Sequence, residues 1–151
     1  MKFEESAGGI VYKPSLRPDG LKKEDNQVFI LVVQHSQHHG WGFPKGLIGP
    51  GEDKKTTALR EVVEEGGVEA KIAGELPPTE YFYQFGDQKI KKKVTYFLMQ
   101  YISGDPEDHD WEMEDAQWIL EEEVIERLTF KSDKEVFQKA QKLLKKRDHP
   151  V

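Results

Sequence analysis

Closely spaced carboxylates between Gly46 and Val68 are the residues of this chain best suited to chemistry. The segment reads Gly46-x5-Glu52-x7-Arg60-Glu61-Val62-x-Glu64-Glu65-x-Gly67-Val68. On a helix, Glu61, Glu64 and Glu65 would lie within one turn, where their carboxylates repel one another. Mg²⁺ or Mn²⁺ would relieve that repulsion, because hard cations prefer oxygen ligands and also bind substrate phosphates. The pattern indicates a metal site for phosphate chemistry, and the alternative is a solvated acidic helix face.

A helix over 53–66 is expected to position these carboxylates. Asp53 is a suitable N-cap, and the pair Gly66-Gly67 suits the end of the helix, where a positive φ is common. At about 100° per residue, the apolar side chains fall on one arc and the polar ones on the other. The apolar arc holds Ala58, Leu59, Val62 and Val63, and the polar arc holds Thr57, Arg60, Glu61, Glu64 and Glu65. The glutamates and the valines are thus expected on opposite faces.

The segment at 43–52, directly before this helix, is rich in glycine and proline. Glycine allows the backbone to approach a ligand closely, and both residue types favour turns. Its attachment to the acidic helix predicts a loop that brings backbone carbonyls and amides close to a metal or a phosphate.

Composition limits the possible functions. The chain has 151 residues, no cysteine and a net charge of −6, from 28 acidic and 22 basic residues. This length predicts one domain over 1–151, and the lack of cysteine excludes disulfide and thiol chemistry. The negative charge argues against stable nucleic-acid binding. Without a long apolar run or a signal-peptide pattern, a cytoplasmic monomer or homodimer without a membrane segment is expected.

The remaining pattern alternates strands with a few helices. Strands are expected at 6–12, 27–34, 68–76, 79–85, 90–101 and 116–120, with a turn at Gly86-Asp87. Residues 13–26 predict an exposed loop. Two helices follow the last strand, the second opening with the capping box Ser132-x-x-Glu135. Its apolar stripe comprises Val136, Phe137, Ala140, Leu143 and Leu144. The fold class predicted is α/β, a mixed sheet between helices.

The segment from Gly46 to Val68 resembles the signature of the Nudix hydrolases, with every fixed position filled. Three further segments resemble the diadenosine polyphosphate hydrolases of the MutT-like branch: Ala7-Gly8-Gly9-Ile10-Val11-Tyr12, Trp41-Gly42-Phe43-Pro44-Lys45-Gly46 and Lys93-Val94-Thr95-Tyr96-Phe97-Leu98. The stretch at 133–140 is similar to the last helix of those enzymes. The resemblance covers nearly the whole chain except an insertion at 14–25. It implies the Nudix fold, an α/β/α sandwich with a mixed sheet and a loop-helix motif.

The resemblance also implies roles for individual residues. Glu61, Glu64 and Glu65 match the glutamates that bind metal, Glu52 orients the site, and Arg60 pairs with the glutamates and holds their rotamers. The backbone carbonyl of Lys45 or Gly46 is expected to complete the coordination. A carboxylate from a later loop is expected as a further ligand or base. Glu112 fits that place best, with Glu114 and Asp115 as rivals and a solvated loop as the alternative.

Substrate contacts are expected from basic and aromatic residues outside the signature. Lys93 closes the basic run at 89–93, and Lys45 lies beside the expected metal site. Tyr83 and Tyr96 resemble tyrosines that sandwich adenine, and Trp41 is expected to line the base pocket. The alternatives are core aromatics and a solvated strand edge.

His35, His38 and His39 permit a transition-metal site, an exposed loop or a phosphate contact. The glutamate cluster already supplies ligands for the metal chemistry, which argues against a transition-metal site at the histidines.

These observations predict an enzyme that uses two or three Mg²⁺ or Mn²⁺ ions to direct water at a diphosphate. The expected substrate is a dinucleoside polyphosphate, with diadenosine tetraphosphate giving ATP and AMP. Alternatives are a MutT-like pyrophosphohydrolase of (oxidised) nucleoside triphosphates, an RNA 5′-pyrophosphohydrolase, and a Nudix-fold module that senses nucleotides without cleaving them. Glu61 and Glu112 are the candidates for the general base.

Overall fold

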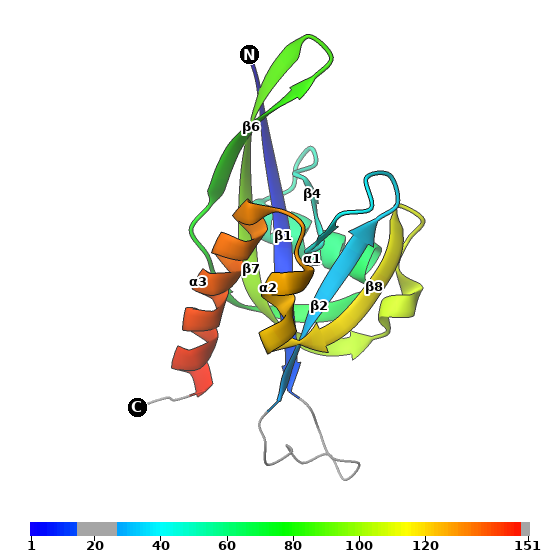
Figure 1. The fold of residues 1–151 in the computed structure, drawn as a ribbon, viewed down its shortest axis with the longest axis vertical. Coiled ribbons are helices and arrows are strands. Elements are labelled where there is room, and N and C mark those ends of the chain that lie inside the picture. The colour runs from blue at the N-terminus through cyan, green and yellow to red at the C-terminus, as the bar shows by residue number, and fades with distance from the viewer. Residues whose placement is uncertain (15–26, 149–151) are drawn as a thin grey trace.

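One mixed β-sheet organises the chain (Figure 1). The computed structural model describes residues 1–14 and 27–148. The strands of the described residues are β1 (Lys2–Pro14), β2 (Val28–His35), β3 (Trp41–Gly42), β4 (Lys45–Leu47), β5 (Val68–Glu75), β6 (Thr79–Phe85), β7 (Gln88–Gly104) and β8 (Met113–Leu120). Strands β3-β2-β1-β7-β5 follow one another across the sheet, while β4 pairs with β1, β6 with β7 and β8 with β2. The central strands β1 and β7 are parallel, and the other pairings are antiparallel.

Helices cover both faces of the sheet. The helices are α1 (Lys54–Gly66), α2 (Val124–Arg127) and α3 (Lys131–Asp148), with single 3-10 turns η1 (Pro106–Asp108) and η2 (Glu121–Glu123). In Figure 1, α2 and α3 lie in front of the sheet and α1 lies behind it. This arrangement confirms the α/β class and the α/β/α sandwich that the sequence predicted.

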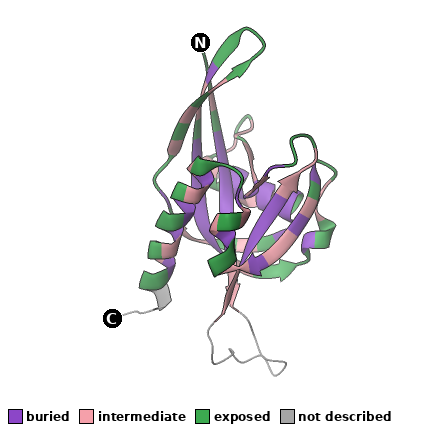
Figure 2. Ribbon diagram, in the orientation of Figure 1, coloured by how far each residue is buried: buried purple, intermediate pink, exposed green. Residues whose placement is uncertain are grey.

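Each face of the sheet has its own hydrophobic core because side chains alternate along a strand. Ala7 and Val11 of β1 pack with Val62 of α1. Ile10, between them in sequence, packs on the other face with Val136 and Phe137 of α3. The buried residues in Figure 2 therefore follow the central strands, which are covered on both sides. The apolar stripe expected for the last helix is confirmed, although α3 begins at Lys131 and not after a Ser132 cap.

Helix α1 begins and ends where the sequence predicted. The Asp53 side chain accepts a hydrogen bond of 2.8 Å from the backbone amide of Thr56, which satisfies one of the free donors of the first turn. At the other end, Gly67 has φ 74° and donates its amide to the Val63 carbonyl. These two caps fix the length of the helix and therefore the position of its glutamates.

The buried arc of α1 differs from the expected one. Glu61 and Glu65 are buried together with Val62, whereas Val63 is 47% exposed. The expectation that glutamates and valines lie on opposite faces is therefore wrong in part. Strand β4 packs along the side of α1 that carries Glu61 and Glu65, through Gly46 and Lys45. Helical periodicity within α1 contains no information about this contact.

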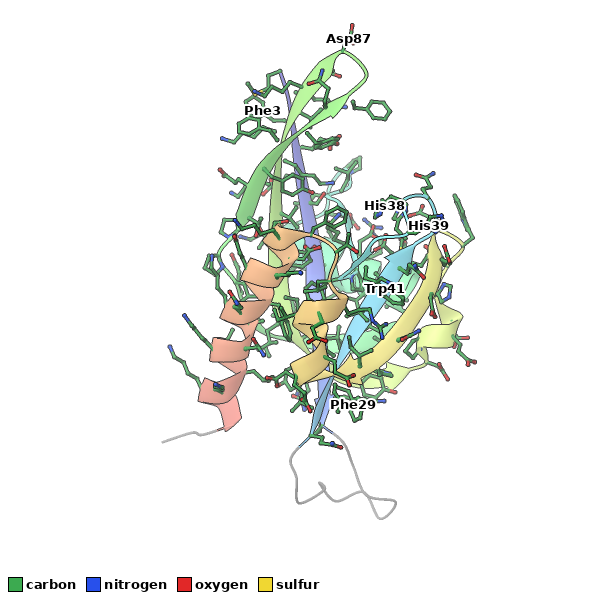
Figure 3. All side chains as sticks on the ribbon, viewed as in Figure 1. Phe3, Phe29, His38, His39, Trp41 and Asp87 are labelled. Atoms are coloured by element: carbon green, nitrogen blue, oxygen red, sulfur yellow. The ribbon has the colours of Figure 1, made fainter. Side chains whose placement is uncertain are left out.

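A hairpin of β6 and β7 extends past the body together with the start of β1 (Figure 1). Figure 3 places Phe3 and Asp87 at this end, well separated from His38, His39 and Trp41. The hairpin has the expected turn, with Gly86 at φ 64°, and β6 has the expected bounds. The other expected strands are present with shifted ends, and Gly104 ends β7 later than predicted.

The structure bears on the predicted loop at 13–26 and on membrane-spanning helices only through the residues that it describes. Most of the exposed loop predicted for 13–26, including the insertion at 14–25, lies outside the described residues. Of the helices that the structure does describe, none combines the length and the apolar character needed to cross a membrane.

Candidate active site

Glu52 is fixed by donors on both of its oxygens. Arg60 forks onto it, with Nε 2.8 Å from Oε2 and Nη2 2.9 Å from Oε1. The Gly49 amide and the Thr57 hydroxyl also donate to Oε1, at 2.9 Å and 3.0 Å. The Arg60 hydrogen bond is the largest of the causes that lower the pKa of Glu52 to about 2. Glu52 therefore stays charged and anchors the loop before α1 to the helix.

Arg60 extends this anchor to two further glutamates. Its Nη1 lies 2.8 Å from Glu61 Oε1 and 3.2 Å from Glu64 Oε2. A planar guanidinium holds its donors in a fixed fork, so the three carboxylates that it contacts are oriented together. The structure therefore contains the contacts between Arg60 and the glutamates that were expected, while the roles of Glu52 and Arg60 in catalysis stay predictions.

Glu61 is buried against the backbone of Gly46. Only 8% of Glu61 is exposed, and a Cβ added to Gly46 would lie 2.2 Å from Glu61 Oε1. Burial raises the pKa of Glu61, with further upward contributions from the negative charges of Glu64 and Glu112 and an opposing one from Arg60. The absence of a side chain at position 46 is thus what allows this carboxylate to reach the β4 backbone.

Glu65 is the second buried acid, with 7% of its surface exposed. The backbone amide of Lys45 donates to its Oε1 at 3.0 Å. Burial raises the pKa of Glu65 to about 8, and the charges of Glu61 and Asp110 push it in the same direction. A buried carboxylate with acidic neighbours is costly unless a cation compensates it.

The loop before β8 brings further carboxylates to α1. The backbone amide of Asp110 donates to the Glu64 carbonyl at 2.8 Å, and the negative charge of Asp110 contributes to the raised pKa of Glu65. Glu112 is exposed, yet its negative charge contributes to the raised pKa of Glu61. Asp110 was not among the candidates from the sequence, because acidic residues recur throughout this loop and only the backbone contact with α1 singles it out.

The rivals of Glu112 are engaged elsewhere. Glu114 Oε1 lies 2.5 Å from His39 Nδ1, and Asp115 accepts hydrogen bonds from the Ala116 amide and the Gln117 side chain. Asp110 and Glu112 are thus the loop carboxylates whose charges raise the pKa values of Glu65 and Glu61, and the role of Glu112 as a ligand or base stays a prediction.

The donor set fits a hard divalent cation. Glu61, Glu64 and Glu65 offer carboxylate oxygens, and the β4 backbone lies close to two of them, with Gly46 beside Glu61 and Lys45 beside Glu65. Such all-oxygen sets suit Mg²⁺ or Mn²⁺. As the side chains stand, no three acidic or histidine residues in the described part of the chain form a ready coordination group. Arg60 binds Glu61 and Glu64 instead, so these two side chains would turn when a cation binds.

The raised pKa of Glu65 predicts how stability depends on pH. Between about pH 4.5, the pKa of an ordinary glutamate, and about pH 8, the folded chain keeps a proton that the unfolded chain releases. Folding stability without metal should therefore fall as pH rises through this window, and the gain from Mg²⁺ should grow. Melting temperatures in EDTA and in Mg²⁺ from pH 5.5 to 8.5 measure both effects. Because other groups also titrate, the wild type is compared with Glu65→Gln, and equal pH slopes in the two proteins would contradict the prediction.

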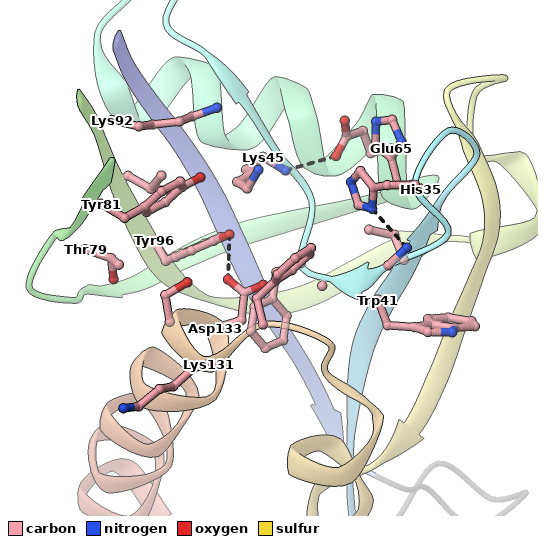
Figure 4. Close-up of a pocket in the computed structure, with 18 of the residues that line it drawn as sticks. His35, Trp41, Lys45, Glu65, Thr79, Tyr81, Lys92, Tyr96, Lys131 and Asp133 are labelled. Atoms are coloured by element: carbon pink, nitrogen blue, oxygen red, sulfur yellow. Dashed lines mark hydrogen bonds between the residues drawn. The ribbon is translucent and has the colours of Figure 1, made fainter. Parts of the chain in front are cut away.

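A cavity of about 690 Å³ adjoins the glutamates. Lys45 and Glu65 line one part of it, and aromatic side chains form much of the rest (Figure 4). Phe43 and Tyr96 meet edge to face, with ring centroids 5.8 Å apart, and Tyr81 and Tyr83 lie 6.4 Å apart. The cavity thus joins a charged end beside α1 to an aromatic end over β6, β7 and α3.

Most of the expected substrate residues line this cavity. They are Trp41, Lys45, Tyr83 and Tyr96. Tyr96 is only 2% exposed, and the Tyr83 hydroxyl donates to Glu4 Oε1 at 2.5 Å. The stacking of adenine between these two tyrosines stays a prediction.

Lys93 does not line the cavity, and its neighbour Lys92 does. Alternation along β7 turns Lys92 to the cavity side with Val94 and Tyr96, while Lys93 is exposed on the other face of the sheet. Burial, assisted by the charge of Lys45, lowers the pKa of Lys92. The expectation for Lys93 is therefore corrected, because a run of lysines does not reveal which register faces the cavity.

The histidines do not form a metal centre in the described structure. His35 and His38 stack with centroids 4.4 Å apart and an angle of 11° between the rings. His38 Nδ1 accepts from the Gly40 amide, and burial lowers the pKa of His38, as do the charges of His35 and Lys45. Both rings line the cavity, which leaves a phosphate contact open for them.

Comparison with known proteins adds independent information. The model of the NUDIX domain matches residues 21–140. The chain is 31% identical over 146 residues to a putative mutator protein MutT4 of Mycobacterium tuberculosis (strain CDC 1551 / Oshkosh), a match that covers 95% of the chain but only 56% of that protein. It is also 31% identical over 145 residues to the asymmetrical bis(5′-nucleosyl)-tetraphosphatase of Sus scrofa, covering 92% of the chain and 94% of that enzyme.

A solved structure agrees with the fold. The structure of a C. elegans Ap4A hydrolase in a binary complex superposes with a TM-score of 0.65 at 22% identity, covering 94% of the chain and 98% of that protein.

Proposed function

The chain belongs to the Nudix family, and from that premise we propose that it is a divalent-metal-dependent hydrolase of dinucleoside polyphosphates. The observation that carries this proposal is the junction between Glu65 and the cavity: an acidic, buried cluster opens through Glu65 and Lys45 into an aromatic chamber. A substrate with a polyphosphate and a base would match the two ends. The likeness to an asymmetrical tetraphosphatase over nearly its whole length supports diadenosine tetraphosphate, cleaved to ATP and AMP.

In such a reaction, carboxylates of α1 and the β4 backbone would bind the metal ions, and Lys45 would bind the polyphosphate. Glu61, Glu64 and Glu65, with a backbone carbonyl at Lys45 or Gly46, would hold the ions, and we expect two or three of them. Bound Mg²⁺ or Mn²⁺ supplies charge neutralisation at the phosphates and acidifies a water. The cation of Lys45 attracts the polyphosphate into the cavity.

Orientation and proton transfer fall to other side chains. Arg60 and Glu52 fix the carboxylate rotamers through the contacts described above. Glu112 is exposed, and its charge contributes to the raised pKa of Glu61. We expect Glu112 to take a proton from the attacking water, with Glu61 as the second candidate. Phosphoryl transfer needs mainly positioning and charge stabilisation, so no covalent nucleophile is required.

A second candidate is a MutT-like pyrophosphohydrolase of nucleoside triphosphates. The likeness to a putative mutator protein over 95% of the chain favours it. RNA 5′-ends offer the same diphosphate to the same carboxylates. A sensor that binds nucleotides without turnover is disfavoured, because the chain retains Glu52, Glu61, Glu64 and Glu65.

A nucleotide panel in Mg²⁺ or Mn²⁺, scored by products, tests the proposal. We expect diadenosine tetraphosphate to give ATP plus AMP with a higher kcat/KM than any nucleoside triphosphate or 5′-triphosphorylated RNA. Preferential release of pyrophosphate from one nucleoside triphosphate would select the MutT-like alternative. If the wild-type protein cleaves nothing in the panel with either metal, the assignment as an enzyme fails.

A further inference from the structure

Asp133 is a buried acid that the proposed chemistry does not use. It lies in the first turn of α3, is only 8% exposed, and lines the cavity on the side away from Lys92 and Glu65 (Figure 4). An aspartate is rarely buried without compensation, because its charge loses hydration. The burial of the Asp133 carboxylate in the cavity wall therefore needs a compensating interaction.

The contacts within the described chain compensate Asp133 incompletely. The Tyr96 hydroxyl donates to Oδ1 over 3.4 Å, which is a long hydrogen bond. None of the ion pairs among the described residues includes Asp133, and its neighbour Lys131 pairs with Glu135 instead. Burial raises the pKa of Asp133, which Lys45 offsets only in part. One carboxylate oxygen, Oδ2, is left without a donor in these contacts.

The space in front of Oδ2 is kept open by Gly42. A Cβ at position 42 would lie 3.1 Å from Oδ2, so a larger residue would crowd this oxygen. Trp41 and Phe43 flank the glycine, and both line the cavity. A flat ligand that enters among these rings would meet Oδ2 with its edge.

The chemistry of the cavity limits what that ligand edge can be. A phosphate is repelled by Asp133 and is better placed beside the cations of Lys45 and Lys92. A flat heteroaromatic ring suits the aromatic walls, and a carboxylate oxygen accepts N–H donors. With Oδ1 already taken by Tyr96, a single donor fits better than the two adjacent donors of a guanine edge.

We propose that Asp133 accepts a hydrogen bond from the 6-amino group of an adenine held in this cavity, and so selects the base of the substrate. The proposal rests on the proposed function in one respect, namely that the ligand is a nucleotide. It adds that aromatic stacking alone does not select the base.

Two pairs of nucleotides that differ only by an amino group test this assignment. Calorimetric titration in EDTA compares AMP with purine riboside 5′-monophosphate, which lacks the 6-amino group, and GMP with IMP, which lacks the 2-amino group. We expect AMP to bind wild-type protein at least about tenfold tighter than purine riboside 5′-monophosphate does. A site built to form a hydrogen bond rejects a ligand that leaves that hydrogen bond unmade. The GMP and IMP affinities should agree within about threefold.

Variants locate the effect at Asp133. In Asp133→Leu, which removes the acceptor at similar size, the AMP preference should fall below about threefold. Asp133→Asn adds a donor and should shift binding toward IMP, whose O6 is an acceptor. Glu135→Leu, an equivalent exchange at an exposed position of α3, should keep the wild-type preference. Circular dichroism and melting curves establish that each variant is folded, and Asp133→Asn serves if Asp133→Leu is not.

The assignment is overturned if wild-type protein binds AMP and purine riboside monophosphate equally, if the gap appears only in the guanine pair, or if it survives in Asp133→Leu. Because these titrations need neither metal nor turnover, their outcome is separate from that of the hydrolysis panel. Selective AMP binding without hydrolysis of any nucleotide would refute the proposed activity and leave the assignment of Asp133 standing.

Discussion

Replacement of Glu64 by glutamine is expected to lower metal-dependent turnover by about 10³-fold, equivalent to about 4 kcal/mol of transition-state stabilisation. Glutamine keeps the shape of the side chain but loses the charge that a hard cation requires. The Glu64 side chain is exposed and contacts Arg60 at 3.2 Å, so the folded structure should tolerate the exchange. Initial rates on the best substrate of the panel, at several Mg²⁺ concentrations, measure the loss.

Glu122→Gln is the matched control, because Glu122 is an exposed glutamate far along the chain in η2. It should keep wild-type kcat and wild-type dependence on Mg²⁺. The melting temperature of Glu64→Gln should stay within a few degrees of the wild type. Turnover of Glu64→Gln within about threefold of wild type would remove Glu64 from the metal site and place the whole assignment of ligands in question.

Local patterns were sufficient for much of the fold. Asp53 and Gly67 close α1 where the sequence predicted, because caps depend on residues next to them in the chain. The alternation Thr79–Phe85 predicted β6 with its observed bounds. The pairing of β1 with β7, by contrast, joins residues such as Ser6 and Val94, and no periodicity within either strand specifies that partner.

The candidate site likewise contains residues that local sequence identifies and residues that only the fold brings together. Glu52, Arg60 and Glu61 were identifiable because one loop and one helix carry them all, so sequence spacing translates directly into distance. The burial of Glu61 was not predictable from the helix, since it depends on β4, which the sequence suggested only as a loop. Asp110 and Asp133 come from the loop before β8 and from α3, and only the fold brings them to α1 and to the cavity.

Substitution of Gly46 by alanine is expected to lower turnover by about 100-fold while leaving the fold intact, since misplacing a reacting group by about 1 Å has an effect of that size. The new Cβ would lie 2.2 Å from Glu61 Oε1 and 2.3 Å from its Cδ. These atoms end a flexible side chain, so the carboxylate can move aside without disturbing the backbone. Gly46 is not among the described residues with positive φ, so alanine meets no backbone strain there.

The stability of Gly46→Ala separates this explanation from simple misfolding. A glycine-to-alanine exchange at a compatible φ stabilises by about 0.4–1 kcal/mol through the unfolded chain, and displacing the Glu61 rotamer costs about 0.5–1.5 kcal/mol. The two nearly cancel, so the melting temperature should change by less than about 4 °C. The loss should therefore appear in the dependence of rate on Mg²⁺ and not in the amount of folded protein.

Gly74→Ala supplies the steric control for Gly46→Ala. Its Cβ would meet Leu143 Cδ2 at 2.7 Å, which is again the end of a flexible side chain. Leu143 belongs to α3, where it contacts β5, and it has no part in the proposed catalysis. Gly74→Ala should therefore keep wild-type turnover per folded molecule. If both variants lose activity equally, crowding in general is responsible. If neither does, Glu61 does not need to approach the β4 backbone, and the ligand set must be drawn from Glu64, Glu65 and the loop before β8 alone.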